Sequence, residues 1–165
     1  MIRIIGVGSP FGDDAAGLRA ARRIAKDPPA GIEVVLADRP GIALVDLLRD
    51  ASAAIVIDAV RSGRALGTIH DLDLGEVARL AGRRFTSHDA SLPEALALAE
   101  ALGHELRGRF LGVEIGEPRT ESVGAQGFSA AVDEGLRELT ARARRWAGVL
   151  APQRRFGRTP SLRLR

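Results

Sequence analysis

Residues 53–60 read AAIVIDAV, and Asp58 is the only polar residue among them. An apolar run this short, with β-branched side chains at its centre, predicts a strand that is buried on both faces. Strands of this kind are typical of the middle of a parallel sheet that helices cover on each side. The stretch therefore predicts an α/β fold in which residues 53–60 form a central strand.

Segments with strand and helix patterns alternate along the rest of the chain. The other predicted strands are 2–7, 32–36, 68–72 and 109–115, and the predicted helices are 14–26, 41–49, 91–102 and 129–149. This alternation predicts a three-layer α/β/α sandwich around a mainly parallel, mixed sheet. Residues 68–72 follow the central strand after a short loop, so we expect that one strand to run antiparallel.

The charges divide the chain into two parts. Of its 24 basic residues, five are arginines in residues 151–165, which contain no acidic residue. Residues 1–150 therefore have 19 basic and 21 acidic residues, a net charge of −2. We expect a single domain in residues 1–150 and a basic, flexible tail in residues 151–165. Since the folded part is close to neutral, nucleic acid is not an expected partner.

The composition also excludes several kinds of site. The chain has no cysteine, so disulfides, thiolate metal sites and cysteine nucleophiles are excluded. It contains no apolar run of the roughly 20 residues needed to cross a bilayer. The N-terminus lacks the charged-then-apolar pattern of a signal peptide. We therefore expect a cytoplasmic protein without a membrane partner.

Three segments bring acidic or imidazole side chains to the predicted carboxyl edge of the sheet, where open α/β sheets bind ligands. Asp13 and Asp14 follow the first strand, Asp58 lies in the central strand, and His88 precedes a predicted helix. Two carboxylates and an imidazole suit a divalent ion such as Ni²⁺, Zn²⁺ or Mn²⁺. The residues alone leave open whether Asp13 or Asp14 is the ligand, because the other would cap the following helix.

Each of these residues also has a structural explanation. The Asp58 carboxylate could accept hydrogen bonds from a neighbouring loop, Asp14 could stabilise a helix N-terminus, and a single histidine such as His88 is more often a hydrogen-bonded structural residue. We favour a joint site because separate segments converge on one edge. Glu114 and Glu117, at the end of the last predicted strand, are weaker candidates to line the same cleft.

A nucleotide site is the competing interpretation of the first turn. The glycines in residues 6–12 have the spacing G-x-G-x-x-x-G, one residue longer than the dinucleotide-binding pattern. Pro10 and Phe11 would crowd an approaching phosphate, and Asp38 after the second strand imitates the acid that binds ribose. This hypothesis predicts that a dinucleotide raises the melting temperature.

The same segments resemble the hydrogenase maturation protease family. That family has a strand followed by Gly-x-Gly-Asn and an acidic pair, a strand with Asp-Ala, a Ser-His before a helix, a strand with Glu-Pro, and a final Ser-capped helix. The matching stretches are IIGVGSPFGDDAAG (4–17), AAIVIDAVRSGRALGTIHDL (53–72), FTSHDASLPEALALAEALG (85–103), LGVEIGEP (111–118) and GFSAAVDEGLREL (127–139). Their order and spacing agree over roughly residues 1–146.

The resemblance implies an endopeptidase that removes a C-terminal peptide from the large-subunit precursor of a nickel–iron hydrogenase once nickel is inserted. The nickel is carried by the substrate protein, and the metal-binding residues correspond to Asp14, Asp58 and His88. Another divalent ion (zinc, manganese or cadmium) could take the same place in a crystal. Asp38 is the candidate general base.

Two departures from the family pattern matter. Ser9 stands where asparagine is usual, and residues 37–41 read ADRPG in place of an acid-Gly-Gly-Thr segment. The alternatives are therefore a non-catalytic checkpoint or chaperone for a metalloprotein and, second, a nucleotide-binding domain.

Overall fold

The computed structural model describes residues 1–82, 92–116 and 128–151. Its five strands are β1 (Ile2–Gly8), β2 (Ile32–Asp38), β3 (Ala53–Val60), β4 (Ile69–Asp73) and β5 (Gly108–Glu114). Its helices are α1 (Ala16–Ala25), α2 (Leu44–Arg49), α3 (Leu74–Ala78), α4 (Leu92–Ala101) and α5 (Ala130–Leu150), with 3-10 turns η1 (Gly12–Ala15) and η2 (Gly41–Ala43). None of the helices in these ranges is long and apolar enough to cross a membrane.

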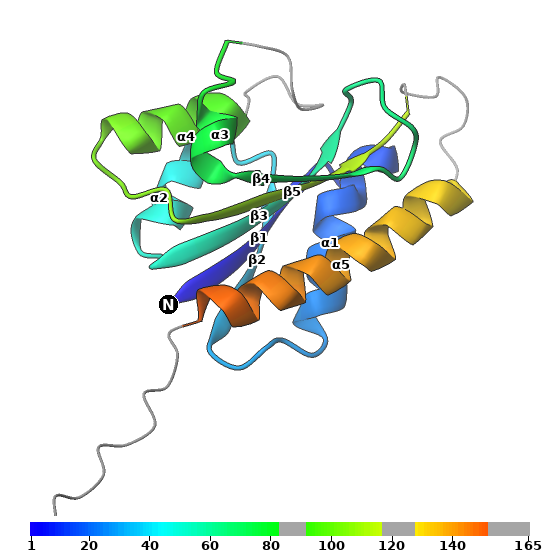
Figure 1. Ribbon diagram of the computed structural model, residues 1–165, viewed down its shortest axis with the longest axis horizontal. Coiled ribbons are helices and arrows are strands. Elements are labelled where there is room, and N and C mark those ends of the chain that lie inside the picture. Colours follow the sequence, from blue (N-terminus) through cyan, green and yellow to red (C-terminus); the bar gives the residue numbers. More distant parts are fainter. Residues whose placement is uncertain (83–91, 117–127, 152–165) are drawn as a thin grey trace, which may run out of the picture.

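The elements form the predicted three-layer sandwich (Figure 1). Helices α1 and α5 cover one face of the sheet, and α2, α3 and α4 cover the other. Neighbouring strand residues point to opposite faces, so Ile55 packs in the core under α1 and α5 while Val56 packs in the core under α2, α3 and α4. Two apolar cores therefore lie on the two sides of one sheet.

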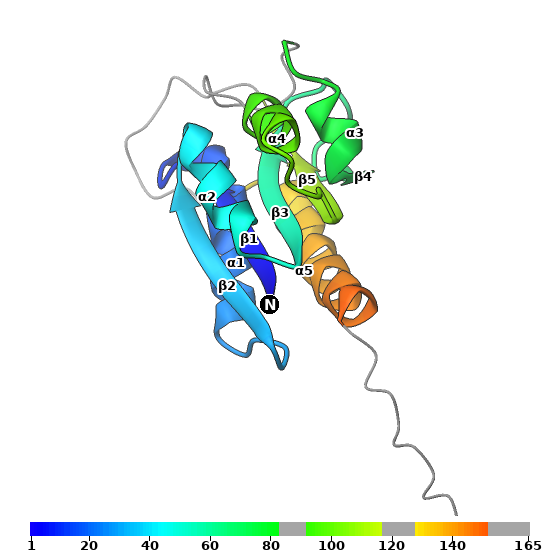
Figure 2. The same cartoon turned by 90° about the vertical axis from the view of Figure 1, so that its left-hand side faces the viewer.

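The sheet has the order β2-β1-β3-β5-β4, and the strand labels in Figure 2 run from β2 to β4 in this order. β3 lies in the middle and all eight of its residues are buried, which confirms the prediction for residues 53–60. The pairs β1–β2, β1–β3 and β3–β5 are parallel. β4 is antiparallel, as expected, and pairs with β5 at the edge of the sheet.

Two helix starts have the predicted chemistry. The Ser129 hydroxyl accepts a hydrogen bond from the Val132 N–H at 3.3 Å and so caps α5. α4 begins at Leu92 with Pro93 in its first turn, while the predicted cap, Ser91, lies outside the described residues. The basic tail predicted for the C-terminus also lies outside them from residue 152 onward.

One short helix was not predicted. α3 follows β4 directly, and its N-cap residue Asp73 forms a capping box with Glu76, whose carboxylate accepts the Asp73 backbone N–H at 2.8 Å. The Asp-x-x-Glu signal is present in the sequence. The helix has only five residues, which is too short for apolar periodicity to show.

Helix α5 lies unusually close to the loop before β4. A Cβ atom at Gly135 would lie 2.6 Å from the Gly67 carbonyl oxygen and 2.9 Å from a Val113 methyl group. A Cβ atom at Gly148, in the same helix, would meet nothing within 4 Å. Gly135 therefore permits a close backbone contact that a side chain would prevent. Gly148 makes no such contact and only lowers the stability of the helix.

We expect Gly135→Ala and Gly148→Ala to change stability in opposite directions. Gly135→Ala should lower the free energy of unfolding by about 1–3 kcal/mol, because the added methyl group overpacks the contact with Gly67. Gly148→Ala should raise it by up to about 1 kcal/mol, because alanine favours the helix. Urea unfolding of both variants measures the two changes. A shift of both variants in the same direction would contradict this account of α5.

Candidate functional site

The first turn of α1 packs against the carboxyl ends of β1 and β3. A Cβ atom at Gly17 would lie 2.1 Å from the Val7 carbonyl oxygen, 2.5 Å from that of Ile57, and 3.0 Å from the Asp58 Cα. Only glycine permits such a close approach of helix and strand backbones. Because Asp14 lies less than one turn before Gly17, this packing brings the η1 turn to the edge where Asp58 lies.

Asp58 is a buried carboxylate at the carboxyl end of the central strand. Its side chain is 1% exposed, and its Oδ1 accepts the backbone N–H of Ala59 at 2.8 Å. In the sheet it is aligned with Gly112 of β5, which has no side chain. Burial of a carboxylate is unfavourable unless hydrogen bonds, a cation or a metal compensates for lost hydration. Asp58 is therefore a buried carboxylate at the edge of the sheet where open α/β folds bind ligands.

Asp14 lies in η1 and forms an ion pair with Arg61. Its Oδ1 accepts a hydrogen bond from an Arg61 Nη atom at 2.8 Å, and the two side chains are 27% and 20% exposed. Arg61 follows β3 directly, three residues after Asp58. The contact shows that the Asp14 carboxylate is turned toward the end of β3, as a site shared with Asp58 requires.

His88, the third predicted ligand, lies outside the described residues, as does Glu117. In the ranges that the structure describes, no group of three or more His, Asp or Glu residues is arranged to hold a metal ion. The structure thus brings two of the predicted side chains to one edge of the sheet. The position of His88 relative to them stays a prediction.

Asp38 ends β2 at the same edge, aligned with Gly8 of β1. Its side chain is about half-exposed, and its Oδ1 accepts a hydrogen bond from the Arg39 Nε at 2.9 Å. Arg39 has a positive φ of 42°, and its N–H donates to the Gly8 carbonyl at 2.9 Å. Since β1 separates β2 from β3, Asp38 lies at the flank of the edge where Asp58 is central.

The sequence suggested Glu114 as a residue that lines the cleft, and this prediction is wrong. Glu114 instead anchors the loop after β3. It is 1% exposed, and its carboxylate accepts the backbone N–H groups of Ser62, Gly63 and Arg64 at 2.7, 2.9 and 3.2 Å. The Ser62 hydroxyl and the His70 Nε2 also lie 2.8 Å from it. A carboxylate with this many partners has no capacity left for substrate, so its role is to fix residues 61–64.

Burial by itself would raise the pKa of Glu114, but the hydrogen bonds from Ser62, His70 and the loop backbone outweigh burial and hold its pKa below the ordinary range. A carboxyl group with a lowered pKa in the folded state stabilises the protein above its unfolded pKa of about 4.3. That contribution is lost as the pH falls through the folded pKa. The loop anchor is therefore strongest at neutral pH.

We expect Glu114→Gln to lower the free energy of unfolding at pH 7 by about 1–3 kcal/mol, because the amide accepts fewer and weaker hydrogen bonds. The difference from the parent should begin to narrow below about pH 4, as Glu114 becomes protonated in the unfolded chain, and should close as the pH falls through the lowered pKa of the folded state. Denaturant unfolding from pH 3 to pH 8 measures this, with the exposed Glu105→Gln as the matched control. A stability difference that stays constant over this range would contradict an anchor that depends on the ionised carboxylate.

The turn after β1 argues against a dinucleotide site. A Cβ atom at Gly6 would lie 2.4 Å from the Ala21 Cβ, so this glycine is explained by packing of α1 on β1. The first turn of the helical segment carries Asp13 and Asp14. Their negative charges would repel a phosphate at the helix N-terminus, which is where dinucleotide-binding folds hold it.

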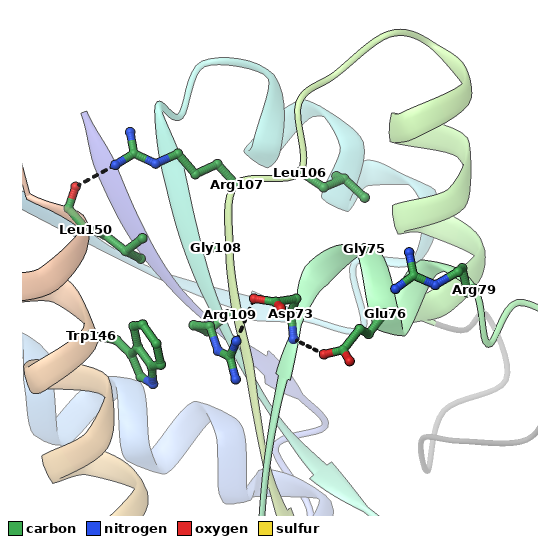
Figure 3. Close-up of a pocket in the computed structure, with 10 residues that line it drawn as sticks. All are labelled: Asp73, Gly75, Glu76, Arg79, Leu106, Arg107, Gly108, Arg109, Trp146 and Leu150. Atoms are coloured by element: carbon green, nitrogen blue, oxygen red, sulfur yellow. Dashed lines mark hydrogen bonds and ion pairs between the residues drawn. The ribbon is translucent and has the colours of Figure 1, made fainter.

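A separate pocket of about 520 Å³ lies at the opposite edge of the sheet, between α3, the start of β5 and the end of α5 (Figure 3). Arg109 is one of the residues that line it. The Arg109 guanidinium nitrogens lie 2.7 Å from a carboxylate oxygen of Asp71 and 2.5 Å from one of Asp73, and its Cζ lies 4.6 Å from the centre of the Trp146 ring. The Trp146 N–H in turn donates to Asp71 at 3.1 Å. These contacts hold α5 against the β4–β5 edge, so Arg109 has a structural role.

An α/β sandwich with an acidic pair after β1 and a buried aspartate at the end of β3 has the features of a hydrogenase maturation protease. The sequence matches the hydrogenase maturation protease family over residues 19–143, and the chain belongs to this family. The match covers Asp38, Asp58 and His88 and begins after Asp14.

Individual relatives agree with this assignment. The chain is 34% identical over 106 residues to the hydrogenase expression/formation protein HupD of Thiocapsa roseopersicina, a match that covers 62% of this chain and 48% of the relative. It is 28% identical over 107 residues to HupD of Rhodobacter capsulatus, covering 62% and 51%. The chain thus spans about half the length of the curated relatives it matches.

Solved structures show the same fold. The hydrogenase maturating endopeptidase HybD of Escherichia coli superposes with a TM-score of 0.70 at 22% identity, over 86% of this chain and 88% of that chain. The [NiFe] hydrogenase maturation protease HybD of Thermococcus kodakarensis gives a TM-score of 0.65 at 20% identity, over 87% and 97%. The agreement in fold confirms the predicted mixed sheet with helices on both sides.

Proposed function

We propose that this chain is an endopeptidase that removes a C-terminal peptide from the large-subunit precursor of a nickel–iron hydrogenase after nickel insertion. The observation that carries the proposal is the buried carboxylate of Asp58 at the carboxyl end of the central strand, beside the turn that holds Asp14. Membership in the maturation protease family supports a hydrogenase precursor as the substrate. A cytoplasmic location, expected from the sequence, is part of the same proposal.

In this proposal the precursor's nickel is the recognition element. Asp14, Asp58 and His88 contact that ion directly or through water. Two carboxylates and one imidazole suit Ni²⁺ and also Zn²⁺, Mn²⁺ or Cd²⁺, and they leave coordination positions for the ligands that the precursor supplies. Three ligands that include no thiolate bind such ions with only moderate affinity. Moderate affinity suits a protein that recognises a metal held by its partner.

Binding of the ion places the scissile peptide next to the carboxyl edge of the sheet, and this proximity lowers the barrier to hydrolysis. Water adds to the scissile carbonyl carbon, the C–N bond breaks, and a proton passes to the departing amine. The nearby metal polarises the carbonyl or the water. Asp38 is the proposed general base, and to act it must exchange its contact with Arg39 for the attacking water.

We expect Asp58→Asn to fold normally but to lose cleavage of the nickel-loaded precursor. Asparagine is isosteric, keeps an oxygen that can accept the Ala59 N–H, and removes a buried negative charge. The melting temperature should therefore stay at or above that of the parent, while intact-mass analysis of the precursor shows no shortened product. His88→Ala should have the same functional effect.

The matched control is Asp50→Asn, because Asp50 is exposed and lies before β3, at the opposite edge of the sheet. This variant should process the precursor like the parent. A destabilised Asp58→Asn protein, or one that processes the precursor normally, would defeat the metal assignment of Asp58. A parent protein that binds the loaded precursor and leaves its mass unchanged would identify a checkpoint or chaperone instead.

A further inference from the structure

Arg61 lies at the candidate site although it is not one of the predicted ligands. One Nη atom donates to the Asp14 Oδ1 at 2.8 Å, and the Nε donates to the Gly116 carbonyl at 3.0 Å. The guanidinium thus joins the turn after β1 to the end of β5, across the carboxyl end of β3. Its positive charge is in contact with the carboxylate that the proposed function assigns to metal recognition.

The backbone that carries Arg61 is held firmly. The next three residues, 62–64, donate their backbone N–H groups to the buried Glu114 carboxylate. The Ser62 hydroxyl donates to the same group. The start of the Arg61 side chain is therefore fixed, and the position of its guanidinium depends on the contacts with Gly116 and Asp14.

The Arg61–Asp14 pair is suited to exchange. Both side chains are partly exposed, at 20% and 27%, so water can solvate each partner when they separate. Water screens the attraction between partly exposed charges, so separating them costs little. A divalent ion attracts the Asp14 carboxylate more strongly than a single guanidinium charge does at similar distance. Arg61 can therefore give up Asp14 and still keep its contact with Gly116.

We propose that Arg61 is a gating residue, whose guanidinium holds Oδ1 of Asp14 and competes with a metal for this carboxylate. The inference rests on the proposed function, because it assumes that Asp14 is a metal-recognition residue. Competition from Arg61 lowers the affinity for free divalent ions in solution. A nickel centre presented by a docked precursor overcomes that competition, because the protein contacts add to the binding energy. Arg61 would thus favour metal held by the partner over free metal.

The test measures Ni²⁺ binding to the purified protein by isothermal titration calorimetry, without any precursor. Arg61→Gln should bind Ni²⁺ about tenfold more tightly than the parent, because a charge-assisted hydrogen bond no longer competes for Asp14. The matched control is Arg64→Gln, which removes the same charge from an exposed side chain of the same loop. Its affinity should change by about twofold or less, since exposed charges at this range are screened.

A double variant, Arg61→Gln with Asp14→Asn, should lose the tenfold gain, because the freed carboxylate is the origin of that gain. Equal affinities in Arg61→Gln and Arg64→Gln, a gain that survives in the double variant, or no binding in Arg61→Gln would each overturn the proposal. If Arg61→Gln melts below the assay temperature, Arg61→Met decides the question, because it keeps much of the apolar stem without the charge.

The inference and the proposed function fail in different ways. A parent protein that never shortens the nickel-loaded precursor contradicts the proposed function, while the Ni²⁺ affinities still report on Arg61. Conversely, the parent could cleave the precursor while Arg61→Gln binds Ni²⁺ with the same affinity as the parent. That result contradicts only the proposed gating role of Arg61.

Discussion

The candidate site depends on the contact between α1 and the ends of β1 and β3 at Gly17. A side chain at this position would run into two strand carbonyl groups, at 2.1 and 2.5 Å. Its absence lets the helical segment lie directly on the sheet, and the η1 turn that precedes it then presents Asp14 beside the end of β3. Without this backbone contact, the η1 turn would lie farther from β3, and Asp14 would not be held at the edge of the sheet where Asp58 lies.

Two carboxylates of equal burial have different surroundings at this edge. Asp58 and Glu114 are each 1% exposed and lie on adjacent strands. Glu114 is surrounded by donors from residues 62–64 and His70, so its charge stabilises a loop. Asp58 lies where the α1 segment, β1 and β3 meet, which is the place where open α/β sheets bind ligands. Burial alone therefore does not distinguish a carboxylate that anchors a loop from one that lies at a ligand-binding edge.

Much of the fold could be predicted because the signals are local. The apolar run at 53–60 and the serine at position 129 depend on residues close in sequence, and both predictions are confirmed. The helix α3 was missed because five residues carry too little periodicity. Its Asp-x-x-Glu box was the available signal.

The site was only partly predictable from sequence. The convergence of Asp14 and Asp58 follows from parallel topology and was expected. The contact of Arg61 with Asp14 joins residues 47 positions apart, and nothing in the sequence separates Arg61 from the many other arginines. The role of Glu114 was also hidden, because a glutamate at a strand end has the same local pattern whether it binds a ligand or a loop.

The central claim is that Asp14, Asp58 and His88 surround one ion at the carboxyl edge of the sheet. The most direct measurement is the anomalous difference map of a crystal soaked in Cd²⁺. We expect one strong peak within about 2.0–2.5 Å of oxygen atoms of Asp14 and Asp58 and of a ring nitrogen of His88, distances typical of divalent ions with these ligands. The Arg61 guanidinium should then have moved away from Asp14. A peak elsewhere on the protein, with Asp14 still paired to Arg61 and none beside Asp58, would contradict the account.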